Sequence, residues 1–373
     1  MFSVYSTLVP YFRQPRVEVL IVNYKKIPLY LAGMACVSAG IAGCGAPSSP
    51  SASGKTHKGP YTIALANSYI GNGWRVEMEH VLEAYSKQAP YNKLVKLQVD
   101  NSGNSVSAQV SSLDNMISAH VNAIIVDAAS PTGLNQVISQ AHQQGIPVIA
   151  FDNTVTSPYA YNVDIHQFQF GVIGATWLVK KLHGHGNIIM NRGVAGTPVD
   201  NRRYQGAMSV FNKYPGIHVV DQVYGNWDDA VTQSQFSTAL ASYPHVNGVW
   251  SEGGTYGAIQ AFKAAGRKLV PMAGEASNGF RLALINTADQ KDGLSGISIG
   301  DPPALSALAL KYALQILQGK KVPHHVWIKP PVLTTSTIKS GVNAFPNLPK
   351  TVFDDFTGVA GLNFTPHQML TGK

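Results

Sequence analysis

Short apolar runs alternate with amphipathic stretches from Tyr61 onward, and this alternation predicts strands and helices in turn. The first strands are expected at TIALAN (62–67), LVKLQVD (94–100), AIIVDA (123–128) and PVIAFD (147–152). The stretches between them place apolar residues three or four positions apart, which predicts helices near 76–89, 104–119 and 133–144. Repeated strand–helix–strand units indicate a parallel sheet with helices on both faces.

A second series of the same kind follows. Its strands are expected at 187–192, 218–225, 248–254 and 269–275, and its helices near 166–182, 199–213, 229–242, 255–265 and 278–288. The remainder predicts a strand at 294–301, a helix at 303–318, a strand at 326–332 and an irregular tail. We therefore predict an α/β fold with two doubly wound parallel-sheet lobes. In such sheets ligands bind at the carboxyl ends of the strands, so a cleft between the lobes is expected.

The N-terminal segment has the layout of a secretory signal. Lys25 and Lys26 precede an apolar run, 27–43, that is too short for a comfortable membrane span. The run ends in IAGC, which resembles a bacterial lipobox, so Cys44 is the expected site of lipidation; the alternative is an ordinary buried cysteine. Residues 1–23 are either an extended start of the signal or a mis-assigned start. The Ser/Pro/Gly-rich stretch 45–60 is typical of a flexible tether to a membrane-anchored body.

Composition excludes several function classes. The chain has 373 residues, 45% hydrophobic and only 13% charged, with a formal charge of +8. Its basic residues are scattered and form no run of five or more, which argues against nucleic-acid binding. Both cysteines, Cys36 and Cys44, lie in the N-terminal segment. The rest of the chain therefore has no disulfide framework, cysteine-based metal site or thiol nucleophile.

Enzyme signatures are weak or absent in the sequence. No G-x-G-x-x-G follows a strand and no P-loop motif occurs, so no cofactor is expected. Gly296–Gly300 spells G-x-S-x-G, but Ser298 lies between two isoleucines in a strand-like pattern, whereas a nucleophile elbow needs a sharp turn into a helix. The histidine pairs 183/185 and 324/325 lack a carboxylate partner at helical spacing, so no metal site is expected.

Polar and aromatic residues instead follow nearly every predicted strand. The set comprises Asn72, Trp74, Arg75, Asp152, Asn153, Asp200, Asn201, Arg203, Trp227, Asp228, Glu252, Glu275, Ser298 and Asp301. Taken singly, such residues are typical of caps and turns, Asp228 above all. As a set, they suit a sugar, because a flat aromatic ring stacks on the C–H face while fixed polar groups hydrogen-bond the hydroxyls.

The loop YIGNGWR raises two narrower expectations. Gly71 and Gly73 are expected to let the backbone turn tightly and present Asn72 and Trp74 to the cleft. Arg75 either contacts the edge of the ligand or pairs with Glu79 one helical turn on.

From about Tyr61 to Pro331 the chain resembles periplasmic sugar-binding proteins, the ribose/galactose-type substrate-binding components of ABC importers. The segments that carry the resemblance are TIALANSYIGNGWR, VDAASPTGL, GIPVIAFDN, GVAGTPVDNRRYQG and AGEASNGF. The resemblance implies a non-enzymatic, monomeric, lipid-anchored protein outside the cytoplasm. It captures a monosaccharide or related polyol by hinge closure and delivers it to an ABC permease.

The resemblance also implies roles for individual residues of the first lobe. Asn72 and Trp74 match the family's sugar-contacting loop, with Trp74 as a stacking plate, and Asp152 matches the carboxylate that accepts from sugar hydroxyls. Arg75 stands where many members have an aromatic residue. Asn153 stands where many have arginine, which leaves the choice between pentose and hexose open.

In the second lobe, Asn201 and Arg203 match the segment with the hydroxyl-binding arginine, and Trp227 matches the opposing aromatic plate. Glu252 or Gly253 falls at a polar strand-end contact, and Glu275 replaces what is often aspartate. Ser298 to Asp301 cover the last contact.

In this family, crossing strands join the lobes in a three-strand hinge, which places the hinges near Asp164, Gly300 and Lys329. The periplasmic binding protein-like lobes are then residues 61–164 plus 301–328 and residues 165–300 plus 329–373.

Three other classes of protein are alternatives. A ligand-sensing protein for a chemoreceptor or sensor kinase has the same signature, and the sequence does not separate it from an importer component. A sugar-responsive repressor needs an N-terminal helix-turn-helix, where this chain has an apolar signal. An enzyme needs a coherent set of reactive residues, which the sequence does not offer.

Overall fold

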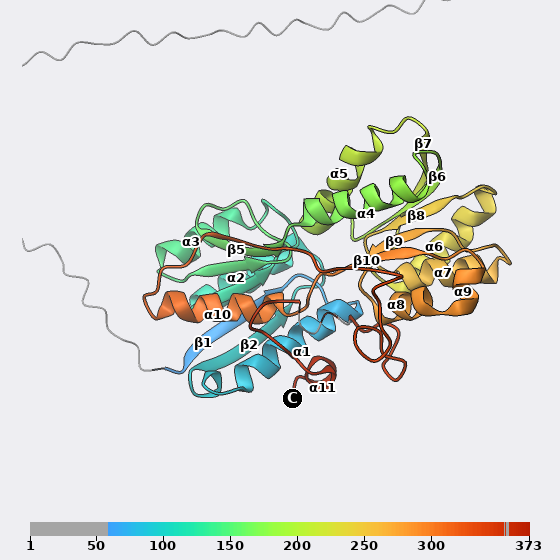
Figure 1. The fold of residues 1–373 in the computed structure, drawn as a ribbon. Helices are drawn as coiled ribbons and strands as arrows, with labels where there is room; N and C mark the ends of the chain where they lie inside the picture. Colours follow the sequence, from blue (N-terminus) through green and yellow to red (C-terminus); the bar gives the residue numbers. More distant parts are fainter. Residues whose placement is uncertain (1–58, 354, 356–357) are drawn as a thin grey trace, which may run out of the picture. The chain divides into compact units, whose positions relative to one another are not determined.

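The polypeptide from Lys55 to Lys373 forms one unit built around two sheets. The computed structural model describes residues 59–353, 355 and 358–373 (Figure 1). The predicted signal, Cys44 and the tether up to residue 58 lie outside the described residues. Within the described part, no helix is long and apolar enough to cross a membrane.

The first sheet has six parallel strands in the order β11-β5-β4-β3-β1-β2. They are β1 (Tyr61–Asn67), β2 (Val95–Asn101), β3 (Ala123–Asp127), β4 (Val148–Phe151), β5 (Ala160–Ile165) and β11 (His325–Ile328). The helices of this lobe are α1 (Gly73–Lys87), α2 (Val106–Ser118), α3 (Asn135–Gln143) and α10 (Leu305–Leu317), with a 3-10 turn at Tyr91–Lys93. We call this sheet with these helices the first lobe.

The first four residues of β3 are all apolar, and the packing of neighbouring residues shows why. Ile125 packs in one buried cluster with residues of α1 and α10, and Ile124 packs in another with residues of α2 and α3. A strand buried on both faces needs a continuous apolar run, unlike a strand with one face in water. The four helices therefore cover both faces of the sheet.

The second sheet has the order β12-β10-β9-β8-β6-β7, and only β12 runs antiparallel to its neighbour. Its strands are β6 (Gly186–Arg192), β7 (Ile217–Tyr224), β8 (Gly248–Ser251), β9 (Met272–Glu275), β10 (Gly296–Ile299) and β12 (Val332–Thr334). Its helices are α4 (Gln167–Lys181), α5 (Pro198–Phe211), α6 (Asp229–Ser242), α7 (Thr255–Ala264), α8 (Asn278–Ile285) and α9 (Thr287–Lys291). Buried residues of α4 and α5 pack on one face and those of α6, α7 and α8 on the other. We call this the second lobe.

Between β1 and β12 the chain passes from one sheet to the other three times. The first crossing is His166, between β5 and α4; the second is 300–304, between β10 and α10; the third is 329–331, between β11 and β12. The two-lobe α/β fold predicted from the sequence is confirmed. Motion at these crossings stays a prediction.

Two predicted elements were wrong in detail. The single strand expected at 326–332 is two strands in different sheets, because Pro330 and Pro331 have no N–H to continue a strand ladder. The helix expected at 278–288 is divided into α8 and α9 at Asn286, whose side chain accepts hydrogen bonds from the N–H groups of Ala288 and Asp289. Strand β5 was not predicted.

The C-terminal tail contacts both lobes. Asn278 at the start of α8 donates its side-chain amide to the carbonyls of Phe345, Leu348 and Pro349. Further on, α11 (Pro366–Thr371) packs on α1, and Lys87 donates to the carbonyl of Gly372. The sequence predicted an irregular tail that belonged with the second lobe, whereas its end is helical and lies on the first.

Candidate ligand-binding site

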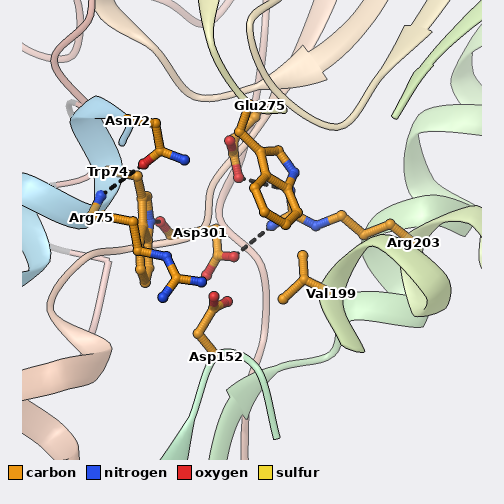
Figure 2. Close-up of a pocket in the computed structure, with 9 residues that line it drawn as sticks. Asn72, Trp74, Arg75, Asp152, Val199, Arg203, Glu275 and Asp301 are labelled. Atoms are coloured by element: carbon orange, nitrogen blue, oxygen red, sulfur yellow. Dashed lines mark hydrogen bonds and ion pairs between the residues drawn. The ribbon is translucent and has the colours of Figure 1, made fainter. Parts of the chain in front are cut away.

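A cavity lies where the carboxyl ends of strands from both sheets meet. It contains about 270 Å³ of free space, part of it open to solvent. Figure 2 shows most of its lining, which consists of Asn72, Trp74, Arg75, Asp152, Val199, Arg203, Trp227, Glu275 and Asp301.

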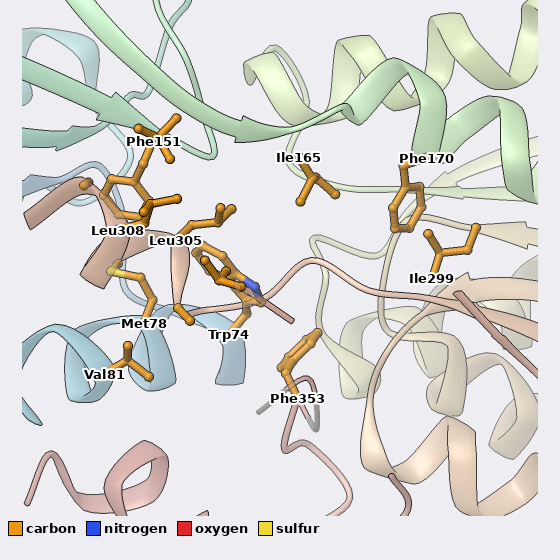
Figure 3. Close-up of a cluster of buried hydrophobic side chains, with 14 of the residues drawn as sticks. Trp74, Met78, Val81, Phe151, Ile165, Phe170, Ile299, Leu305, Leu308 and Phe353 are labelled. Atoms are coloured by element: carbon orange, nitrogen blue, oxygen red, sulfur yellow. The ribbon is translucent and has the colours of Figure 1, made fainter. Parts of the chain in front are cut away.

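The first turn of α1 fixes Trp74 at the cavity. Asn72 caps the helix, and its side-chain oxygen accepts from the N–H of Arg75 at 2.9 Å. The indole Nε1 of Trp74 donates to the carbonyl of Asp301 at 2.6 Å. The ring also packs in the buried cluster with Met78 and Leu305 (Figure 3). Trp74 therefore joins the first lobe to the second crossing.

Both loop glycines lie where a side chain would be crowded, and a Cβ on Gly71 would collide with the side chain of Tyr69. Neither Gly71 nor Gly73 has a positive φ among the described glycines, so no left-handed turn requires them. Gly73 is needed for space, because a Cβ there would lie 2.7 Å from the carbonyl oxygen of Thr351 in the tail.

Arg75 is 2% exposed and lines the cavity. Its guanidinium pairs with Asp127 at 2.5 Å and donates to Asn67 at 2.6 Å. Burial raises the pKa of Asp127 to about 6, although the charge of Arg75 acts in the opposite direction. The proposed pair with Glu79 does not form: Glu79 accepts from Asn67 instead.

Arg203 is the second arginine that lines the cavity. It donates to Glu275 Oε1 at 2.8 Å, to Asp301 Oδ2 at 2.5 Å and to the carbonyl of Glu252 at 2.7 Å. Burial lowers the pKa of Arg203, but the carboxylates of Glu275 and Asp301 outweigh it and raise the pKa. Burial raises the pKa of Glu275 to about 8 despite the adjoining arginine. Its charge is therefore sensitive to pH near neutrality.

Asp152 follows β4 with φ of 54°, a left-handed conformation that few residues other than glycine adopt. Its carboxylate accepts from Gln167 and from Asn153, both at 2.9 Å. Burial, followed by the nearby charges of Asp301 and Asp127, raises the pKa of Asp152 well above its usual value. The unusual backbone places this carboxylate in the cavity wall, and such outliers cluster at functional sites.

Trp227 lies in the loop before α6 with φ of 57°, and Asn226 before it has φ of 53°. The indole is 8% exposed, and its Nε1 has no hydrogen-bond partner among the described residues. The same holds for Oδ1 of Asp301 on the cavity wall. A buried donor and a buried acceptor without partners are costly, and a hydroxyl can satisfy either kind because it both donates and accepts.

Six sequence candidates do not line this cavity. Asp200 pairs with Arg192, and Asp228 caps α6 by accepting from the N–H of Val231. Asn153 donates to Asp127 and accepts from the N–H of Val199. Glu252 accepts from the N–H of Gly193, and Ser298, inside β10, accepts from Arg281. Asn201 is half-buried on α5. Burial also raises the pKa of Glu252 well above its usual value.

Two residues at the site were not predicted from the sequence. Val199 lines the cavity, but an apolar residue at a helix start resembles any core residue. Gln167 bonds three lining residues, yet a glutamine at the first position of a helix carries no sequence signal. Among the described residues, no group of three or more His, Cys, Asp or Glu side chains is arranged to hold a metal ion.

Comparison with known proteins shows what the chain is similar to. Residues 63–321 match the family model described as the periplasmic binding protein domain. The xylitol-binding protein of Mycolicibacterium smegmatis is 28% identical over 275 residues, which cover 73% of this chain and 72% of that protein. The ribose import binding protein RbsB of Bacillus subtilis is 23% identical, over 73% of this chain and 86% of that protein.

The fold has solved counterparts. The crystal structure of an ABC transporter solute binding protein from Thermobispora bispora has a TM-score of 0.67 at 30% sequence identity. The match covers 73% of this chain and 84% of that chain. The matched region therefore includes most of both lobes.

Proposed function

The chain belongs to the periplasmic binding protein family, and we propose that it is the substrate-binding lipoprotein of an ABC importer. In this proposal it captures a monosaccharide or related polyol in the cleft between its lobes and delivers it to a membrane permease. The names of its relatives support this ligand class, since they bind xylitol and ribose.

The observation that carries the proposal is the composition of the cavity wall. Two tryptophans from different lobes lie beside carboxylate and guanidinium groups, and a buried indole N–H and a carboxylate oxygen have no partner among the described residues. Aromatic faces suit the C–H surface of a sugar, and the polar groups suit its hydroxyls. We assign ligand contacts to the lining residues, with Trp74 and Trp227 as stacking surfaces.

Capture by hinge closure is part of the proposal. Contacts between the lobes support it: the carbonyl oxygen of the Asn153 side chain accepts from the N–H of Val199 at 3.1 Å, and Arg202 lies 3.5 Å from Asp164. A ligand that contacts both lobes favours the arrangement in which both sets of contacts form. The hinges would lie at the three crossings, between a lobe formed by residues 61–164 plus 301–328, on which α11 packs, and a lobe formed by residues 165–300 plus β12.

Anchoring is proposed from the sequence. Family membership implies a location outside the cytoplasm, and the lipobox-like IAGC supports a lipid on Cys44. The stretch 45–60 would then be the tether.

A thermal-shift screen tests the ligand class. The purified chain is heated with xylitol, D-ribose, D-xylose, D-allose, D-fructose or myo-inositol, with amino acids at equal concentration as controls. A ligand present at a hundred times its Kd stabilises the folded state by about 2.7 kcal/mol, enough to raise Tm by several degrees. We expect at least one sugar or polyol to do so. A shift with amino acids alone would contradict the assignment.

A further inference from the structure

Gln167 occupies an unusual place between the lobes. It is the first residue of α4 and follows the first crossing, His166, directly. Its side chain is 1% exposed, and it does not line the cavity. It is therefore a buried polar residue at the point where the chain enters the second lobe.

The side-chain amide of Gln167 bonds groups from both lobes. Its Nε2 lies 2.9 Å from Asp152 Oδ1, 3.0 Å from Asp164 Oδ1 and 3.0 Å from Asp301 Oδ2. Its Oε1 accepts from Arg203 Nε at 2.7 Å. Asp152 and Asp164 belong to the first lobe, Arg203 to the second, and Asp301 to the second crossing.

The chemistry of an amide suits this position. The Nε2 group has two hydrogens for three carboxyl groups, while Oε1 accepts from a cation at the same time. A glutamate here would add a fourth carboxyl, and an apolar residue would leave buried oxygens and a guanidinium N–H without a partner. Burial is the main cause that raises the pKa of both Asp152 and Asp164 well above the usual value.

We propose that Gln167 is a positioning residue of the binding site, whose amide holds Asp152, Asp301 and Arg203 in place and couples them to the first crossing. Its predicted effect on affinity rests on the proposed sugar-binding function, whereas its effect on the carboxyl groups does not. The same bonds link the two lobes, so they also favour the arrangement in which both lobes contact a ligand.

Other charged groups surround the amide and its acids. Arg202 pairs with Asp164, and Arg75 and Asp127 act on Asp152. Glu275 shares Arg203 with Asp301. His166, next in sequence, stacks on Trp327 with ring centroids 4.9 Å apart. A His166→Gln background removes that imidazole from any titration.

The indole N–H of Trp74 is a reporter that needs no ligand, because it donates to the carbonyl of Asp301. Its NMR signal in the full chain, labelled with ¹⁵N-tryptophan and assigned with Trp74→Phe, is followed from pH 5 to 9 in the His166→Gln background. Gln167→Met keeps the side-chain length and removes the amide. In Gln167→Met, we expect the midpoint of the titration of Asp152 and Asp164 to rise by about 1 pH unit, because their ionised carboxylates lose the amide of Gln167 as a donor.

Gln109→Met is the matched control. Gln109 is also fully buried, but its amide bonds only backbone groups of Ala66, Asp127 and Ala129. Its replacement should leave the Trp74 midpoint unchanged. A midpoint that is equal with and without Gln167, an equal shift in Gln109→Met, or a Trp74 signal with no pH dependence would overturn the proposal. If Gln167→Met does not fold, Gln167→Glu replaces it and is also expected to raise the midpoint.

Affinity is measured for xylitol, or for the panel sugar with the largest rise in Tm if xylitol gives none. Gln167→Met should weaken binding at least tenfold, and Gln109→Met should not. Gln167→Glu should bind weakly at pH 8 and regain affinity toward pH 5, where a protonated glutamic acid donates again. Affinity equal to that of the unaltered protein in both Gln167 variants would overturn the proposal. If no sugar binds the unaltered protein, the proposed function fails and the indole titration alone decides the role of Gln167.

Discussion

Glu275 should make the protein less stable as pH rises through neutrality. Its carboxyl is buried beside Arg203, and its pKa is about 8 in the folded protein against an ordinary value of 4.5. The folded state therefore binds a proton that the unfolded state has released between these values. Stability falls with increasing pH whenever the folded state binds more protons.

The size of the effect follows from the two pKa values. Between pH 5.5 and 7.5, Glu275 alone should lower the free energy of unfolding by roughly 2 to 3 kcal/mol. Glu275→Gln keeps an oxygen that can accept from Arg203 and cannot titrate. The variant should lose this part of the pH dependence. Urea unfolding of both proteins at pH 5.5, 6.5 and 7.5 measures the difference.

A surface substitution provides the control. Glu83 pairs with Lys87 and its side chain is 41% exposed, so Glu83→Gln makes the same chemical change in solvent. The control should keep the full pH dependence. If Glu275→Gln and the unaltered protein lose the same free energy of unfolding between pH 5.5 and 7.5, the reasoning about this buried carboxyl is refuted.

Three further outcomes are expected. Gly171→Ala should destabilise the fold by about 1–3 kcal/mol, because its Cβ would collide with the backbone carbonyl of Arg203 where α4 and α5 pack together; urea unfolding with an unchanged midpoint would contradict that packing. Asn201→Ala should leave sugar affinity within about twofold, since Asn201 lies outside the cavity wall. A tenfold loss of affinity measured by calorimetry would show that Asn201 belongs to the binding site. Cys44→Ser should move the protein from the membrane fraction to the soluble fraction, and a variant that stays with membranes would argue against lipidation there.

The lobes were predictable because strands in a sheet that is buried on both faces form apolar runs in the sequence. Strands such as AIIVD are apolar up to their last residue, and amphipathic helices separate them, so the alternation of elements defines the architecture. The strands 160–165 and 326–332 were harder to place. Asn162 and Asp164 interrupt the apolar pattern of the first, and the prolines divide the second.

The site was predictable only as a set of strand ends. Parallel strands bring their carboxyl ends to one edge, which is why Trp74, Asp152, Trp227, Glu275 and Asp301 share a cavity. Which side of a strand end faces the cavity depends on tertiary packing. Asn153 and Glu252, adjacent to or at such ends, are instead bonded within the protein, and the left-handed backbone of Trp227 has no signature in residue type.

The central claim is that a sugar binds between Trp74 and Trp227. Calorimetry with the sugar that gives the largest thermal shift, on the full chain and on Trp227→Ala, tests it most directly. Trp177→Ala is the control, because Trp177 lies on α4 outside the cavity wall. Loss of one stacked aromatic face should cost about 1–3 kcal/mol, roughly 5- to 150-fold in affinity, in Trp227→Ala alone. Unchanged affinity in Trp227→Ala, or an equal loss in Trp177→Ala, would contradict the account.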